Sequence, residues 1–227
     1  MKSRQTGFTL VEIAIVLVII GLLLGGVLKG QELINSAKVK NLANDFRNIP
    51  IYIYGYQDRF RALPGDDVNV TTHLAGATKA SSGGGGGVGD GVINGAWFSA
   101  TNTEETFLFW QHVRLAGFAP GSTDIDNLDA YIPRNAEGGR IGVTGANNPP
   151  IKDANGNNLR GTFFICSANI SGKFAKQLDM MMDDGNTATG SMMTAANQTV
   201  TGNATPTSAV ATANIDDGTP YMVCMGI

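Results

Sequence analysis

The strongest constraint on this chain is an uninterrupted apolar run near its N-terminus. Residues 13–28 read IAIVLVIIGLLLGGVL and include no charged side chain. The run is near the lower length limit for a bilayer-spanning helix, and residues 8–11 extend it beyond Glu12. Segment 8–28 is therefore predicted to be a helix that needs lipid or other apolar helices around it.

A short basic leader precedes this run and contains Lys2 and Arg4. The positive-inside rule places the leader in the cytoplasm and the C-terminal bulk on the other side of the membrane. A secretory signal would also begin with basic residues and an apolar core, but it would end in a small-residue cleavage site. Here Val27-Leu28-Lys29-Gly30 follows the core, so removal of the whole apolar helix is the weaker interpretation.

Glu12 is the ionisable residue within segment 8–28. A charged side chain in a membrane span costs about 3 kcal/mol even on the lenient insertion scales, so a functional role is expected. The segment contains no basic side chain. A cut between Gly7 and Phe8 would create an α-amine that could neutralise the Glu12 carboxylate of a neighbouring copy.

The stretch GFTLVEIAIVLVIIG resembles the prepilin junction and first helix of type IV pilins and type II secretion pseudopilins. The residues that carry the resemblance are Gly7 before the cut, Phe8 after it and Glu12 at the acidic position. The resemblance implies that a prepilin peptidase cleaves after Gly7 and methylates the Phe8 amine. It also implies a subunit held in the bacterial inner membrane, with its head outside the cytoplasm, until an assembly platform adds it to a helical filament. The filament would contain copies of this chain and other pilins and would lie at the cell surface or in the periplasm.

Beyond residue 28 the apolar side chains recur at helical spacings as far as Ile53, and polar side chains fill the other face. Pro50 is expected to kink this helix, which should end before Leu63-Pro64-Gly65. The predicted organisation is a leader over 1–7, a long helix over 8–61 with 8–28 as transmembrane segment and filament core, and a globular head over 62–227.

Gly21 and Gly25 are four residues apart, as are Gly26 and Gly30. Small residues at this spacing let apolar helices approach closely, so Gly21, Gly25 and Gly26 are predicted helix-packing positions. Two alternatives are ordinary membrane-helix glycines and a local loss of helicity, since glycine costs about 1 kcal/mol relative to alanine in a helix.

The fold class is predicted to be α+β, with the long helix packed on a small, loop-rich, antiparallel, pilin-like head. Residues 162–166 are the clearest strand, with further strands at 140–143 and 221–224. Residues 104–117 should form a helix capped by Thr103, on which His112 is partly exposed. Residues 171–182 should form another helix, and 187–213 an exposed loop.

Net charge and cysteine content limit the classes of partner that the chain can bind and the compartment in which its head folds. The chain of 227 residues has a net charge of −3, and cleavage after Gly7 leaves 14 basic and 19 acidic side chains, a net charge of −5. This acidity gives no support for binding nucleic acid, which needs a basic surface. Cys166 and Cys224 are either two buried thiols or a disulfide, and export of the head favours the disulfide.

Two groups of oxygen ligands suggest calcium as a cofactor. Asp179, Asp183 and Asp184 crowd the C-terminal end of a predicted helix, where carboxylates are unfavourable unless solvent or a cation relieves them. Asp90 and Asn94 match part of a calcium loop, but Val92 and Thr101 stand where an EF-hand needs ligands, so only an irregular site is conceivable there. The alternative in both places is a solvated turn.

No enzyme motif is present: the sequence lacks G-x-S-x-G, H-E-x-x-H and C-x-x-C, and His73 and His112 are far apart in it. Three hypotheses therefore stand. The chain is a structural subunit of a type IV pilus-like filament, a pseudopilin of a secretion or DNA-uptake machine, or a membrane-tethered binding domain or hydrolase that shares only the leader. A non-enzymatic filament subunit is the favoured interpretation.

Overall fold

A computed structural model describes residues 10–81, 86–197 and 206–227. The chain forms two compact units, of which the first ends at Lys40 and the second runs from Asn41 to Ile227. The leader and the cleavage junction, including Gly7 and Phe8, lie outside the described residues.

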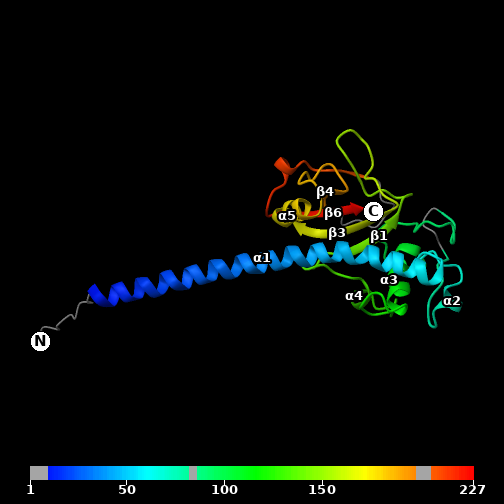
Figure 1. The fold of residues 1–227 in the computed structure, drawn as a ribbon, viewed down its shortest axis with the longest axis horizontal. Helices are drawn as coiled ribbons and strands as arrows, with labels where there is room; N and C mark the ends of the chain where they lie inside the picture. The colour runs from blue at the N-terminus through cyan, green and yellow to red at the C-terminus, as the bar shows by residue number, and fades with distance from the viewer. Residues whose placement is uncertain (1–9, 82–85, 198–205) are drawn as a thin grey trace, which may run out of the picture. The chain divides into compact units, whose positions relative to one another are not determined.

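Helix α1 is continuous from Leu10–Phe60 (Figure 1). It passes through Pro50 and ends one residue before the predicted boundary. Arg61 adopts a positive φ of 56°, and its N–H still bonds to the carbonyl of Gln57 at 2.9 Å. A left-handed residue at this position turns the chain out of the helix.

The second unit is built on a four-stranded antiparallel sheet in the order β1-β3-β6-β4. Its strands are β1 (Ile141–Gly145), β3 (Phe163–Ser171), β6 (Pro220–Gly226) and β4 (Met192–Ala196). The predicted strands at 140–143, 162–166 and 221–224 correspond to β1, β3 and β6. Strand β4 lies in a segment predicted to be an exposed loop, so that prediction was wrong. Its backbone pairs with β6 from Met192 to Ala196, and Met192 and Ala195 are completely buried.

From Asn41 onward, α1 contributes one face of its surface to the core of this unit. The fully buried side chains on that face are Leu42, Ala43, Phe46, Ile53 and Tyr56. Spacings of three, four and seven residues place these side chains along a single stripe of the helix. The amphipathic pattern in the sequence therefore corresponds to an observed core face, and the α+β class with a helix packed on an antiparallel sheet is confirmed.

A second apolar cluster lies on the face of the sheet that carries Phe164, Cys166 and Ala168. Trp97 packs into this cluster and is 2% exposed. Gly142 on β1 lets the Trp97 backbone approach, since a Cβ at this glycine would collide with the Trp97 carbonyl oxygen. The strand is thus held against a loop that comes from far earlier in the sequence.

The remaining elements are short apart from two helices. They are α2 (Val70–His73), α3 (Glu105–Leu115), α4 (Leu128–Tyr131), β2 (Ile151–Lys152), α5 (Gly172–Met182), β5 (Thr207–Ser208) and a 3₁₀ turn, η1 (Thr212–Asn214). Strands β2 and β5 pair in parallel as a separate two-stranded sheet. Helix α5 matches its predicted range within one residue.

Helix α3 corrects two predictions. Its N-cap is Glu104, which makes no side-chain capping bond, so Thr103 is not the cap. His112 is completely buried rather than partly exposed. Helix α3 packs against β1 and is apolar on several sides, with Phe107, Leu108 and Phe109 all buried. A helix buried on most of its surface leaves no exposed face for His112.

Candidate functional site

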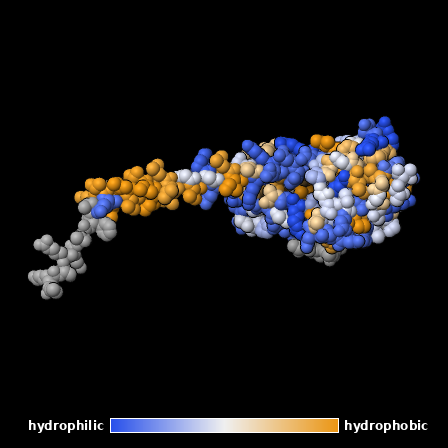
Figure 2. Space-filling model, turned by 90° about the horizontal axis from the view of Figure 1, so that it is seen from below, coloured by the Kyte–Doolittle hydropathy of each residue, from blue (hydrophilic) through white to orange (hydrophobic). Residues whose placement is uncertain are grey.

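The first functional feature is the apolar surface of the N-terminal part of α1. From Leu10 to Leu28 every large apolar side chain is between 46% and 90% exposed. Figure 2 shows this segment as an almost continuous hydrophobic surface. Among the described residues, α1 is the one helix long and apolar enough to cross a membrane. So much exposed apolar area is costly in water, and the segment therefore requires lipid or other proteins around it.

Glu12 lies in the first turn of α1, within this apolar surface. The N-terminal end of a helix carries a partial positive charge, which favours a carboxylate there. The predicted charge pair joins Glu12 of one copy to the Phe8 amine of a neighbouring copy, and Phe8 is outside the described residues. The assembly role of Glu12 thus stays a prediction.

The helix glycines have open space around them. A Cβ placed on Gly21, Gly25, Gly26 or Gly30 would meet nothing within 4 Å. Each of these residues lies in continuous α-helix. Since nothing in the described part of the subunit requires a glycine there, any requirement for small residues must come from contacts with other molecules.

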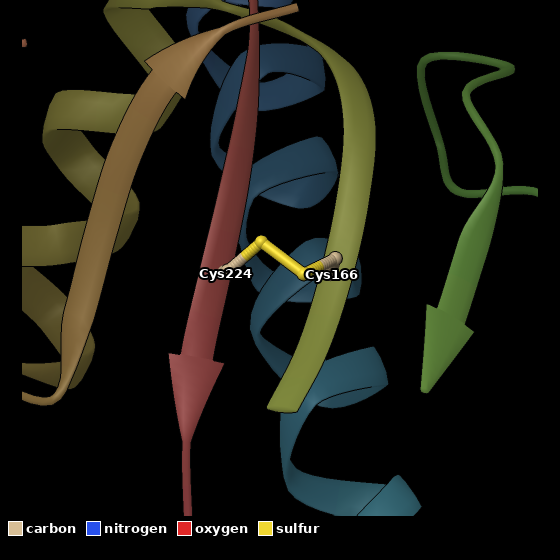
Figure 3. The surroundings of a disulfide bond; sticks show 2 residues. All are labelled: Cys166 and Cys224. Carbon is tan, nitrogen blue, oxygen red and sulfur yellow. A yellow bond between two sulfur atoms is a disulfide. The ribbon is translucent and has the colours of Figure 1, made fainter. Parts of the chain in front are cut away.

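The predicted disulfide is present and joins neighbouring strands. Cys166 on β3 and Cys224 on β6 face each other in the antiparallel register, with their Cα atoms 4.1 Å apart (Figure 3). Both residues are completely buried in the cluster that contains Trp97 and Phe164. A buried structural disulfide is typical of proteins that fold in an oxidising compartment, which agrees with an exported head.

Two of the three carboxylates at the end of α5 have protein hydrogen-bond donors. Asp183 accepts from the N–H of Met192 at 2.8 Å, and Asp184 accepts from the N–H of Asn186 at 2.8 Å. Asp179 is completely buried, and neither carboxylate oxygen has a hydrogen-bond partner among the described residues. Burial, and then the charges of Asp183 and Asp184, raise the pKa of Asp179 to about 7.

Asp90 and Asn94 contact each other directly. The Asn94 side-chain nitrogen donates to both Asp90 oxygens at 3.0 and 3.1 Å, and Asp90 also accepts from the N–H groups of Gly87 and Val92. In the described ranges, no group of three or more His, Cys, Asp or Glu residues is arranged to bind a metal ion. Calcium binding at either position stays a prediction.

Sequence reasoning missed a set of buried polar residues around α3 and the end of α1. Glu105 is completely buried and accepts from the N–H of Asn94 at 2.7 Å. Burial, followed by the nearby charges of Asp66 and Asp90, raises the pKa of Glu105 to about 8, although the Asn94 bond opposes this shift. The only hint in the sequence is the placement of Glu105 in the first turn of an otherwise apolar helix.

His112 joins two loops to α3. Its Nδ1 accepts from the N–H of Gly65 at 2.9 Å, so its Nε2 carries the proton and donates to the carbonyl of Thr78 at 2.8 Å. Burial lowers the pKa of His112, which keeps the ring neutral. With both nitrogens used for structure, His112 has neither a free lone pair for a metal nor a role as a base.

In the comparison with known proteins, one region of the chain matches a described family. Residues 2–28 match the family model described as the prokaryotic N-terminal methylation motif. No curated protein and no solved structure matches the chain. The match covers the leader, Gly7, Phe8, Glu12 and the exposed apolar part of α1, which are the residues that the sequence singled out. The N-terminal segment of this chain therefore carries the methylation motif that is the signature of type IV pilins and pseudopilins.

Proposed function

We propose that the chain is a structural subunit of a type IV pilus-like filament, assembled from the bacterial inner membrane after cleavage between Gly7 and Phe8. The observation that carries this proposal is the continuity of the methylation motif with an apolar helix surface. Residues 2–28 match the motif, and from Leu10 to Leu28 the same segment exposes its large apolar side chains. Such a surface suits a membrane before assembly and a bundle of neighbouring helices afterwards.

The head supports a structural role by its construction. A buried disulfide joins the two central strands of its sheet, β3 and β6, and both sheet edges have further hydrogen bonds. On the β1 side Gly145 donates to the Ile93 carbonyl, and on the β4 side Val210 donates to the Thr194 carbonyl. Covered edges limit uncontrolled strand pairing between heads, so contacts through the N-terminal helices can direct assembly.

The sequence of events begins at the leader. A prepilin peptidase cleaves after Gly7 and methylates the Phe8 amine, and the subunit stays in the membrane through residues 8–28. An assembly platform then adds it to a growing filament, in which the Glu12 carboxylate of one copy neutralises the Phe8 amine of the next. Pairing the two charges lowers the cost of placing both among apolar helices.

A pseudopilin of a secretion or DNA-uptake machine is the second candidate, because the methylation motif is the signature of both classes. The two differ in the length of the filament that the protein forms. Overexpression of a pilus subunit should yield long filaments that can be sheared from cells, whereas a pseudopilin restricted to a short periplasmic assembly should leave little to shear.

The proposal is tested by intact-mass measurement of the exported protein together with electron micrographs of the sheared surface fraction. The expected mature protein lacks residues 1–7 and carries one methyl group on Phe8. Gly7→Val should retain the leader and remain in the membrane, while Thr6→Ser, a neighbouring change, should be processed normally. A mature N-terminus near Ala37 would overturn the proposal, because the apolar helix would then have been removed.

A further inference from the structure

A polar hollow on the head lies between two segments that are distant in the sequence. One is the chain from Asp153 to Arg160, after β2, and the other is the turn from Thr189 to Ser191, before β4. The hollow has a volume of about 370 Å³. This falls in the range of about 300–1,000 Å³ that is common for small-molecule sites.

Asp153 supplies a fixed, ionised carboxylate at one side of the hollow. Its Oδ1 accepts from the N–H groups of Asn155 and Asn157, both at 2.8 Å, and its Oδ2 accepts from the Asn157 side chain at 2.9 Å. The hydrogen bonds from Asn157, foremost among those around it, lower the pKa of Asp153. Each oxygen has two lone pairs, so Oδ2 can accept a further bond from a ligand hydroxyl.

Three other side chains offer unused hydrogen-bonding groups to the same space. Arg160, Asn158 and Ser191 are exposed, and within the described residues their side chains make no hydrogen bond or ion pair. The guanidinium presents up to five donors, while the amide and the hydroxyl can both donate and accept. Met193 also lines the hollow and is 5% exposed, so it adds a small apolar contact area to the polar lining.

The chemistry of the lining selects the class of ligand. One carboxylate and one guanidinium give the lining no net charge, so a strongly anionic ligand has no excess of positive charge to meet. A nucleobase would need an aromatic surface for stacking, and no aromatic residue lines the hollow. A metal ion would need several carboxylates, and in the chain as described no such group exists.

We infer that this hollow binds a neutral saccharide unit. Sugar hydroxyls both donate and accept, so adjacent hydroxyls can donate to Asp153 and accept from Arg160 and Asn158, with Ser191 bonding to a third. The C–H face of the ring packs on Met193. Binding of one unit is weak, since each hydrogen bond replaces one to water. In a filament, many copies of the site would act together and convert weak binding into strong attachment. That consequence rests on the filament role proposed above, whereas binding by a single subunit does not.

The test uses the processed full-length chain in micelles of dodecyldimethylamine oxide, a detergent without a sugar headgroup. Saturation-transfer NMR is recorded with methyl glycosides of glucose, galactose, mannose and N-acetylglucosamine at millimolar concentration. At least one should receive saturation and titrate to a dissociation constant. Arg160→Ala and Asn158→Ala should each weaken that binding, the former by about tenfold or more, as expected for loss of a bond to a charged group.

Arg47→Ala is the matched control, because Arg47 is an exposed arginine on α1 that does not line the hollow. It should leave binding unchanged, and thermal unfolding should show that all three variants are folded. The inference is overturned if none of the glycosides binds, if Arg160→Ala binds as well as the parent chain, or if methyl sulfate binds and the neutral sugars do not. A filament made of such subunits would still form, so these failures leave the proposed function untouched.

Discussion

The hydroxyl of Tyr56 donates a 2.8 Å hydrogen bond to Oδ2 of Asp67, and this contact joins the last turns of α1 to the loop that follows it. The same oxygen lies 2.6 Å from Nδ1 of His73, and Oδ1 accepts from the N–H of Asn69 at 2.9 Å. Asp67 is only 1% exposed. A buried carboxylate is tolerated when donors surround it, so the Tyr56 hydroxyl stabilises the loop as well as the helix end.

Removing that hydroxyl should therefore destabilise the head. Burial, and then Asp67, raise the pKa of Tyr56, so it remains a neutral donor. We expect Tyr56→Phe to lower the free energy of unfolding by about 1.5–3 kcal/mol, the usual value of a hydrogen bond to a charged group. Denaturant unfolding of the full chain in detergent measures this. The control is Tyr54→Phe, since Tyr54 is 51% exposed, and equal effects of the two changes would contradict the prediction.

Glu105 should make stability fall as the solution becomes more basic. The pKa of Glu105 is about 8 in the folded protein, against the ordinary 4.5, so the folded state holds a proton that the unfolded state has lost between these values. Stability is then lost as the pH rises from about 4.5 to about 8. Glu105→Gln should remove this pH dependence and raise the thermal midpoint at pH 8.

The matched control for Glu105 is an exposed carboxylate, Asp126, changed to Asn. Thermal unfolding at pH 5 and pH 8 is compared for the parent chain and both variants. If Glu105→Gln loses as much stability between these pH values as the parent chain, another group is responsible.

Ionisation of Asp179 should also lower the stability of the folded protein as the pH rises, over a lower pH range than that of Glu105. Burial and the charges of Asp183 and Asp184 place its pKa at about 7, against 3.8, so its contribution to stability is lost as the pH rises from about 4 to about 7. Asp179→Asn should therefore be more stable than the parent chain at pH 7.5 and little different at pH 4. The same samples titrated with calcium test the cation predicted at α5, because bound calcium would stabilise the parent chain at neutral pH and not the variant.

The disulfide between Cys166 and Cys224 closes a loop with a sequence separation of 58 residues. Replacing both cysteines with alanine should lower the free energy of unfolding by about 4 kcal/mol on the chain-entropy model. The double replacement avoids a buried unpaired thiol. Protein isolated after export should show no free thiol when denatured without reductant, and two labelled thiols would contradict the bond in the natural compartment.

Glu12 should be needed for assembly and dispensable for insertion and cleavage. In Glu12→Val the membrane helix carries no charged side chain, so insertion is equal or better, and Gly7 is untouched. The Phe8 amine of an incoming subunit would then meet no Glu12 carboxylate among apolar helices, at a cost of several kcal/mol. Sheared filaments should be almost absent, while processed subunit accumulates in the membrane.

Glu32→Val is the control for Glu12, because Glu32 is an exposed residue of the same helix, paired with Lys29 at 2.7 Å. It lies outside the apolar run and should assemble nearly as the parent chain does. Normal filaments from Glu12→Val would mean that apolar packing alone drives assembly.

The features that the sequence predicted well depend on short-range information. A long apolar run without charge favours a helix through local information alone, and α1 accordingly ends at Phe60, one residue before its predicted boundary. The strand at 162–166 is similarly evident, because its run of aromatic and β-branched residues favours extended backbone. Cleavage and methylation motifs are also local, which is why the match over residues 2–28 agrees with the sequence interpretation.

What only the tertiary structure decided is which polar and ambiguous segments are buried. Residues 192–196 read MMTAA and favour no particular state, and they form β4 because β6 supplies the hydrogen bonds and the core. Nothing in the sequence marks Glu105, Asp67 and His112 as buried, yet other segments of the chain, which for Asp67 include the last turns of α1, cover them and supply their partners. The N-terminal helix and its processing signal were thus determined by the sequence itself, whereas burial, and with it the shifted pKa values and the polar hollow, arises from segments that meet only when the chain has folded.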